Sequence, residues 1–217
     1  MLAINNRMLE LKRINYHPAT SEYPVLKEIT LQGTKGRPLI ISGPSGSGKT
    51  SLIEVISGIT AQNNGNIFWN KILVNERQRK RISGVVFQFP ERHFIGLTVA
   101  QELRIGLRRL SGDLQTETLK KVGLENINIT DSPEKLSGGQ QRRIAIAVQL
   151  IRKPQILLLD EPTAGLDWSV RDEILKLIKL LSQEQLLIIV THEPQLFKAC
   201  DSKKYQLNNG VLNQLTK

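Results

Sequence analysis

Glycine, lysine and threonine stand at the spacing of a phosphate-binding loop in residues 43–50, which fit the pattern G-x-x-x-x-G-K-[ST]. Glycines allow the backbone to turn tightly and to approach phosphate oxygens, so that several N–H groups converge on the anion. In such a loop Lys49 bridges the β- and γ-phosphates, and the Thr50 hydroxyl binds Mg²⁺. We therefore expect the nucleotide to be bound by Gly43, Pro44, Ser45, Gly46, Ser47, Gly48, Lys49, Thr50 and Ser51.

Two acidic residues, Asp160 and Glu161, follow a run of four apolar residues at positions 156–159. Such a run indicates a buried strand, so the Asp160 carboxylate should emerge at the carboxyl end of a parallel sheet, where ligands bind. Carboxylate oxygen suits Mg²⁺, directly or through water. Glu161 is the residue that we expect to position and polarise an attacking water. A helix-capping role for one acid is the simpler alternative.

A second glycine-containing segment, Leu136-Ser137-Gly138-Gly139-Gln140, lies between the phosphate loop and the acidic strand end. It precedes an amphipathic helical pattern, and glycines with a small hydroxyl at a helix start form a second anion site. A plain helix cap would explain Ser137 alone, but not the whole pentapeptide or its position. A single polypeptide does not need two such sites for one terminal phosphate.

Short apolar runs predict the strands that position these residues, at 39–41, 85–87, 156–159 and 186–190. Continuous runs of this kind favour a parallel sheet covered by helices on both faces. A short helix should follow the phosphate loop and end at Gly58, and an apolar stripe over 170–181 predicts another helix, capped by Asp167 or Ser169. Residues 9–32 with 66–69 read as antiparallel strands, and residues 90–153 as mostly helical.

Composition limits the class of protein. The 217 residues suit one compact domain, no apolar run reaches the roughly 20 residues of a membrane span, and the N-terminus has no hydrophobic signal core. We expect a soluble chain with no internal disulfide, since Cys200 is its only cysteine. The net charge of +10 is dispersed, with short clusters at 77–81, 104–109 and 142–143. Aromatic residues do not interleave with them, so a solvated or membrane-facing surface is favoured and nucleic acid is not expected.

From about Tyr16 to His192 the sequence resembles the ATP-binding subunit of an ABC transporter. The resemblance rests on the phosphate loop, the segment 136–140 and the run Asp160-Glu161-Pro162-Thr163-Ala164-Gly165-Leu166-Asp167. It implies an α/β fold: a P-loop NTPase with a mostly parallel core sheet, an N-terminal antiparallel β subdomain and a helical subdomain inserted at roughly 90–153. Residues 1–217 would form a single ABC ATPase domain with ATP and Mg²⁺ as its ligands.

The resemblance also assigns further residues. Gln88 corresponds to a glutamine that touches Mg²⁺ and the attacking water, and His192 to a histidine that contacts the γ-phosphate. Tyr16 would stack on adenine, with Tyr23 as the competing candidate. In the family two ATPase subunits pair head to tail, so that the signature of one subunit, which is the segment 136–140 in this sequence, closes over ATP held by the other. The residues expected to contact the partner's ATP are Ser137, Gly138, Gly139, Gln140 and Asp167.

Residues 86–94, Val-Phe-Gln-Phe-Pro-Glu-Arg-His-Phe, resemble the ATPases of energy-coupling factor and cobalt/nickel-type importers. The resemblance implies import of a metal ion or vitamin through a separate integral membrane subunit, with this chain on the inner face of the membrane. Trp168 departs from the pattern, which usually has proline there, and the chain ends soon after its last strands. A soluble ABC ATPase acting in protein or cofactor assembly is the alternative function, and a small-molecule kinase is a third. The sequence does not identify the transported substrate. It also does not say whether the two paired ATPases are identical or different.

Overall fold

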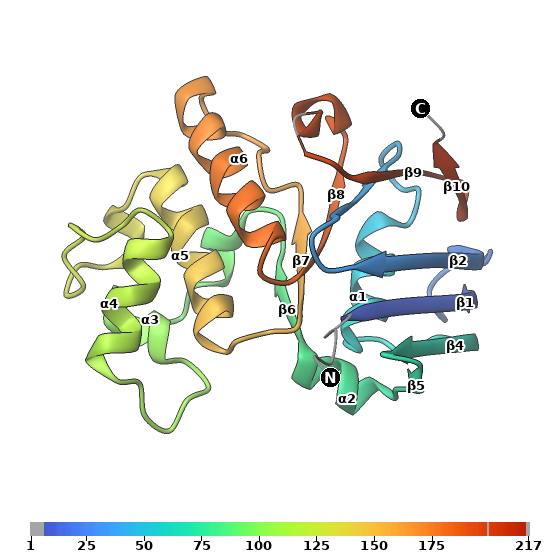
Figure 1. The fold of residues 1–217 in the computed structure, drawn as a ribbon, viewed down its shortest axis with the longest axis horizontal. Coiled ribbons are helices and arrows are strands. Elements are labelled where there is room, and N and C mark those ends of the chain that lie inside the picture. Colours follow the sequence, from blue (N-terminus) through green and yellow to red (C-terminus); the bar gives the residue numbers. More distant parts are fainter. Residues whose placement is uncertain (1–6, 199, 216–217) are drawn as a thin grey trace, which may run out of the picture.

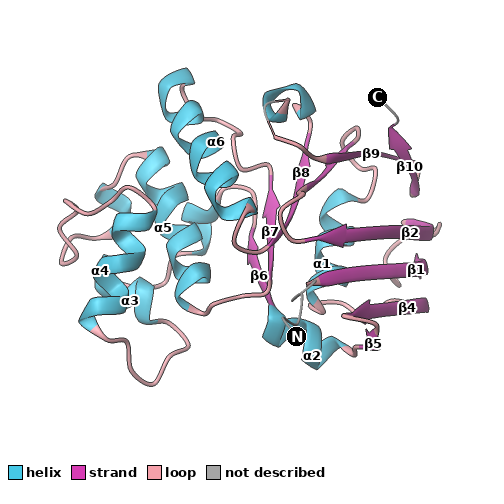
Figure 2. Cartoon of the chain, viewed as in Figure 1, coloured by secondary structure: helices cyan, strands magenta, loops and turns pink. Residues whose placement is uncertain are grey.

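The computed structural model describes residues 7–198 and 200–215. A larger β-sheet occupies the middle of the molecule, with a helical region on one side and a smaller antiparallel sheet on the other (Figure 1). Colouring by secondary structure separates these three parts clearly (Figure 2). The arrangement confirms the predicted fold class.

The larger sheet has the strand order β10-β9-β3-β8-β7-β6. Its strands are β3 (Leu39–Ser42), β6 (Ser83–Val86), β7 (Ile156–Asp160), β8 (Leu186–Thr191), β9 (Lys203–Asn208) and β10 (Val211–Leu215). Neighbouring strands are parallel, except in the hairpin of β9 and β10. Strands β3, β7 and β8 are buried along their whole length, because layers cover both faces of a parallel sheet.

Alternate residues of β7 contribute to two separate hydrophobic cores. Leu157 and Leu159 pack on the side of the helical region, whereas Ile156 and Leu158 pack on the side of the antiparallel sheet. This follows from the strand geometry, in which successive side chains point to opposite faces. The central sheet is thus held from both sides, and the ends of its strands are fixed in space.

The smaller sheet has the order β2-β1-β4-β5 and is antiparallel throughout. Its strands are β1 (Met8–Tyr16), β2 (Leu26–Thr34), β4 (Asn64–Trp69) and β5 (Ile72–Leu73). The first three confirm the antiparallel strands predicted for the N-terminal part of the chain.

Helices α3 (Val99–Arg104), α4 (Gly112–Lys121) and α5 (Gly138–Ile151) occupy the stretch predicted to be helical. This stretch lies between β6 and β7, which pair directly with each other, so it is an insertion beside the sheet. Side chains cap each helix at its start, because Thr98, Ser111 and Ser137 accept hydrogen bonds from backbone N–H groups of the first turn.

The remaining α-helices are α1 (Lys49–Ser57), α2 (Glu76–Ile82) and α6 (Trp168–Ser182). Helix α1 ends at Gly58, whose φ of 79° is left-handed, as predicted. Asp167 is the N-cap residue of α6, although its side chain makes no capping hydrogen bond. Helix α2 was not predicted. Its capping box, in which Asn75 and Gln78 bond reciprocally, is a signal that the sequence does contain.

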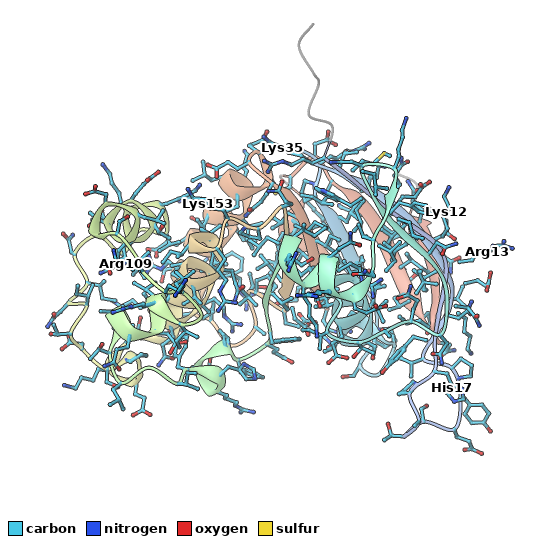
Figure 3. The ribbon with its side chains drawn as sticks, turned by 90° about the horizontal axis from the view of Figure 1, so that it is seen from below. Lys12, Arg13, His17, Lys35, Arg109 and Lys153 are labelled. Atoms are coloured by element: carbon cyan, nitrogen blue, oxygen red, sulfur yellow. The ribbon has the colours of Figure 1, made fainter. Side chains whose placement is uncertain are left out.

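The basic clusters are not all solvated, which corrects the expectation for two arginines. Arg79 is buried and donates to the Gln62 side chain, and Arg142 is buried and donates to the Ala164 carbonyl at 3.0 Å. Other basic side chains are spread over the molecule, as Figure 3 shows for Arg109 at one end and Lys12 at the other. This dispersal agrees with the interpretation of the net charge.

Within the described ranges, no helix is long and apolar enough to cross a membrane. The expectation about a signal core concerns the N-terminal residues, of which 1–6 lie outside the described part of the chain.

Candidate nucleotide site

The phosphate loop connects β3 to α1 and has a conformation that its glycines permit. Gly46 and Gly48 adopt left-handed φ values of 75° and 101°. A Cβ atom on Gly43 would collide with the carbonyl oxygen of Leu207 in β9, so only glycine fits there. The loop ends at the N-terminus of α1, which begins at Lys49. Backbone N–H groups without a partner in the helix attract an anion there.

Lys49 is almost fully buried, and its charge is directed into the loop. Its Nζ donates to the carbonyl oxygens of Gly43 at 2.8 Å and Pro44 at 3.0 Å, and lies 3.3 Å from Nε2 of His192. Burial lowers the pKa of the Lys49 ammonium, and the negative charge of Glu161 opposes that shift. A phosphate oxygen would be a stronger, charge-assisted acceptor than either carbonyl.

Thr50 and Asp160 come together as the sequence predicts for a magnesium site. The Thr50 hydroxyl donates to Oδ2 of Asp160 at 2.8 Å. These two oxygens suit Mg²⁺, which usually takes one or two protein ligands and completes its shell with water and substrate phosphates. The described residues hold no group of three or more His, Cys, Asp and Glu side chains that could bind a metal by themselves.

Glu161 lies between the ends of two strands. Its backbone N–H donates to the carbonyl of Val190 in β8 at 2.9 Å, and its φ of 46° is left-handed, which is uncommon for a residue other than glycine. The turn carries its carboxylate to His192, whose backbone N–H donates to Oε2 at 3.1 Å and whose Nε2 lies 3.3 Å from Oε1. Glu161, the candidate base, is therefore in contact with His192, the residue expected to contact the γ-phosphate.

One cavity collects most of the predicted residues. It is lined by Val25, Ser45, Gly46, Gly48, Lys49, Thr50, Ser51, Gln88, Asp160, Glu161 and His192. Gln88 follows β6 and is exposed at this cavity. Each predicted catalytic and magnesium-binding residue is thus present, although these strand ends are far apart in the sequence.

The adenine-stacking residue stays a prediction. Tyr16 ends β1 and packs, half-buried, against the core, and it is not among the residues that line the cavity. Tyr23 is largely exposed. The residue that sequence reasoning missed is Val25, which lines the cavity and donates its N–H to the Tyr16 carbonyl at 2.8 Å. Its position just before β2 is the only signal that could have identified it.

The signature lies outside this cavity. Ser137 Oγ accepts from the Gln140 N–H at 3.3 Å, and Gln140 Oε1 accepts from the Ser137 N–H at 2.9 Å, so the pair forms a capping box at the start of α5. Gly138 lies near Leu166 and Gly139 lies against Val170, two residues on either side of Asp167 in the chain. The structure therefore groups the signature with Asp167 and separates both from this chain's own phosphate loop.

Replacing Asp160 with asparagine should raise the thermal stability of the nucleotide-free protein at neutral pH. Burial raises the pKa of the Asp160 carboxyl above its ordinary 3.8, against the Thr50 hydrogen bond and the Lys49 and His192 charges. At neutral pH the ionised Asp160 carboxylate therefore lowers the free energy of unfolding, and asparagine, which carries no charge, removes this loss. The difference in melting temperature between the two proteins should shrink as the pH falls toward 3.8. A melting temperature that falls in Asp160→Asn at neutral pH would contradict this.

The fold and the cavity define a P-loop nucleotide hydrolase. Residues 26–164, more than half of the chain, match the ABC transporter family. The chain belongs to this family, and it is an ATP-binding ATPase.

Individual relatives agree with this assignment. The chain is 31% identical to the energy-coupling factor transporter ATP-binding protein EcfA1 of Mycoplasma mobile, over 88% of this chain and 73% of that protein. It superposes on CbiO1 from Clostridium perfringens, part of the ABC transporter complex cbiONQ, with a TM-score of 0.84 and 29% identity over 96% of this chain and 87% of that one. It also superposes on a dimeric ATP-binding cassette, MJ0796 bound to ADP and Pi, with a TM-score of 0.80 and 28% identity over 96% and 99%. These matches confirm the resemblance to energy-coupling factor and cobalt-type ATPases.

Proposed function

We propose that this chain hydrolyses ATP as one of two paired ATPase subunits and powers the import of a metal ion or vitamin through a separate membrane protein. The observation that carries the proposal is the separation of the signature from a cavity that is otherwise complete. Such a chain needs a second subunit to close over its nucleotide.

The residues of the cavity divide the chemical work. When ATP binds, the Lys49 ammonium would give up its hydrogen bonds to the carbonyls of Gly43 and Pro44. It would donate instead to oxygens of the β- and γ-phosphates. Glu161 accepts the proton of the attacking water, and His192, which touches both Glu161 and Lys49, fixes that carboxylate relative to the phosphate. Mg²⁺, held by Thr50 and Asp160 beside Gln88, would supply charge neutralisation at the phosphates.

The partner subunit would supply the second half of the anion site. The N-terminus of α5 presents free N–H groups and the Ser137 hydroxyl, which suit the γ-phosphate of a nucleotide bound by the other copy. The dimeric MJ0796 cassette, similar over 96% of this chain, supports this pairing.

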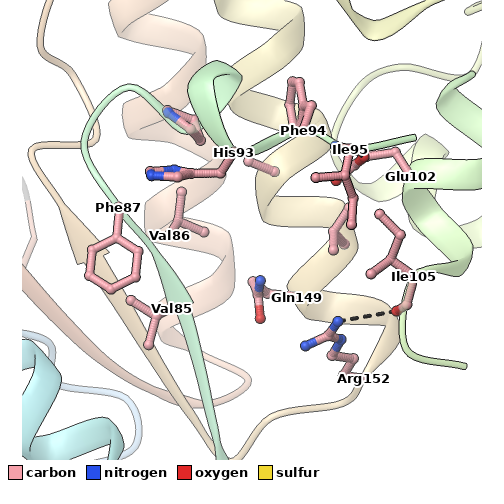
Figure 4. Close-up of a pocket in the computed structure, with 13 residues that line it drawn as sticks. Val85, Val86, Phe87, His93, Phe94, Ile95, Glu102, Ile105, Gln149 and Arg152 are labelled. Atoms are coloured by element: carbon pink, nitrogen blue, oxygen red, sulfur yellow. Dashed lines mark hydrogen bonds between the residues drawn. The ribbon is translucent and has the colours of Figure 1, made fainter. Parts of the chain in front are cut away.

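A groove beside Gln88 is the candidate contact with the membrane protein. It is lined mainly by apolar groups, among them Val85, Phe87, Phe94 and Ile105 (Figure 4). Phe87, which lines the groove, directly precedes Gln88, which lines the catalytic cavity. A partner bound in the groove would therefore lie next to the catalytic cavity.

The rim of this groove is a loop held by a buried carboxylate. Oε2 of Glu102 accepts from the N–H groups of Ile95 at 3.0 Å and Gly96 at 2.7 Å. The loop thereby presents two apolar side chains to solvent, Ile95 with 76% and Leu97 with 79% of their surface exposed. Ile95, which lines the groove, and Leu97, two positions further along the same loop, are apolar side chains that suit a helix of a protein partner.

Replacing Leu97 with aspartate should weaken the membrane partner's binding at least about tenfold, because a charge would enter the apolar contact. ATP hydrolysis by the isolated protein should stay unchanged, since Leu97 lies outside the catalytic cavity. Co-purification yield and ATPase rate are the two measurements. Ile72→Asp is the matched control, at an exposed position in β5 of the smaller sheet. Equal loss of partner in both variants, or full retention in Leu97→Asp, would argue against the groove.

The whole proposal is tested by affinity purification of tagged Glu161→Gln protein from mild-detergent membranes, with mass spectrometry of the bound proteins. A polytopic membrane protein in stoichiometric yield would support a transporter on the inner face of the membrane. Recovery only from the soluble fraction, with soluble partners, would favour the assembly-factor alternative. A second ATPase in the complex would establish a heterodimer.

A further inference from the structure

Trp168, the first residue of α6, is exposed over 77% of its surface. It directly follows Asp167, whose side chain makes no capping hydrogen bond. The guanidinium of Arg171 lies over the indole ring, 5.9 Å from its centroid, and the Nη1 of Arg171 is 3.2 Å from Glu193 Oε1. Arg171 is thus fixed by an ion pair and supports the ring, while most of the indole faces solvent.

The segment that contains Trp168 packs against the signature. A Cβ on Gly138 would be 4.0 Å from the Leu166 side chain, and a Cβ on Gly139 would collide with Val170. Arg142 in α5 donates to the Ala164 carbonyl at 3.0 Å, which also joins α5 to the segment before α6. In Figure 1 the N-terminal ends of α5 and α6 lie together, at the upper side of the molecule. Trp168 is therefore carried by a segment that lies directly beside the signature.

We infer that Trp168 is an anchor of the interface with a second copy of this chain, and that it becomes buried when ATP closes the pair. The inference rests on the proposed head-to-tail function, and it adds a residue outside the nucleotide cavity to that interface. Two features favour a second copy as the occupant. Leu166 and Val170, on either side of Trp168 in the chain, lie against the anion site that the second copy must cover. A tryptophan held by neighbouring groups is also a side-chain type that often contributes strongly to protein interfaces.

The tryptophan itself provides the measurement. The chain has two tryptophans, so Trp69→Phe leaves Trp168 as the sole indole fluorophore. In Trp69→Phe/Glu161→Gln protein, Mg·ATP should shift the Trp168 emission to shorter wavelength and reduce its quenching by acrylamide several-fold. Light scattering on the same samples reports whether the dimer has formed. Dimer formation with unchanged emission and quenching would overturn the inference and leave the proposed function standing. A change in emission that requires added anionic vesicles would also overturn the inference. If ATP induces no dimer at all, both the inference and the proposed function are contradicted.

A second experiment measures how much Trp168 contributes. Trp168→Ala should raise the dissociation constant of the ATP-bound dimer at least about tenfold. ATP hydrolysis should then fall at low protein concentration and recover at high concentration, a dependence that damage to the catalytic cavity would not produce. Trp168→Phe should restore part of the affinity, and the exposed Ile72→Ala, in the smaller sheet, should resemble the wild type. A Trp168→Ala protein with the wild-type dissociation constant would overturn the inference.

Discussion

Glu161→Gln protein should hydrolyse ATP about 10²–10⁴-fold more slowly than the wild type, because glutamine cannot accept the proton of the attacking water. ATP binding should be unaffected, since Lys49 and the loop N–H groups, and not Glu161, hold the phosphates in the proposed mechanism. The amide of glutamine also preserves the size of the side chain, which contacts His192 at the end of β8. The protein should therefore accumulate as a closed, ATP-bound dimer.

The two measurements are the steady-state release of phosphate and the mass in solution with and without Mg·ATP. Glu54→Gln is a matched control. Its carboxylate lies in α1, where burial raises its pKa and the negative charge of nearby Asp160 adds to the shift, but it does not line the cavity. We expect that variant to hydrolyse ATP at nearly the wild-type rate. Undiminished hydrolysis by Glu161→Gln would remove Glu161 from the catalytic role.

Two inactive variants should restore activity when they are mixed, if each active site combines residues of two subunits. Lys49→Ala lacks the phosphate-binding ammonium, and Gly138→Asp places a negative charge at the signature. Each variant alone should lose at least about 100-fold in rate, since both sites of its dimer carry the defect. In a mixed dimer one site has an intact phosphate loop from one subunit and an intact signature from the other. Random pairing in equal amounts should recover about a quarter of the wild-type rate.

The structure makes Gly138→Asp suitable for this test. The nearest atom to a Cβ at Gly138 is the Leu166 side chain at 4.0 Å, so a Cβ is accommodated there without a clash. Aspartate in the first turn of α5 also interacts favourably with the helix dipole, so folding should not suffer. Melting temperatures of the separate variants provide the control. No recovery of activity in a mixture that light scattering shows to contain dimers would contradict a shared site.

Much of the fold follows from local sequence pattern. The apolar runs that became β3, β6, β7 and β8 are short, continuous and bounded by turn residues, which is typical of buried parallel strands. Helix α2 was missed because its basic residues looked like a charged surface cluster. Its buried Arg79 depends on an acceptor, Gln62, that lies 17 positions away in the chain. Such long-range pairing decides burial, and residue type alone does not indicate it.

The candidate site likewise has features that follow from local sequence and features that depend on distant parts of the chain. The residues of the phosphate loop and of the acidic strand end were predicted because their chemistry depends on neighbours in the sequence. The contact of Glu161 with His192 depends instead on the parallel pairing of β7 with β8 and on a left-handed turn at a glutamate. The position of Val25 depends on its backbone hydrogen bond to Tyr16, the last residue of β1 in the antiparallel sheet. Pattern therefore predicts which groups take part, and the tertiary pairing of strands decides which groups touch.

The close approach of Gly43 to the Leu207 carbonyl has a practical consequence for engineering this protein. The hairpin of β9 and β10 is also joined to the smaller sheet, because the Lys27 N–H donates to the Gly210 carbonyl at 2.8 Å. The phosphate loop is thus shaped partly by residues more than 150 positions away. A tag, fusion or truncation that disturbs the hairpin would impair nucleotide binding even with residues 43–50 intact. Insertions are better placed at the exposed turn between β4 and β5, which contributes nothing to the lining of the cavity.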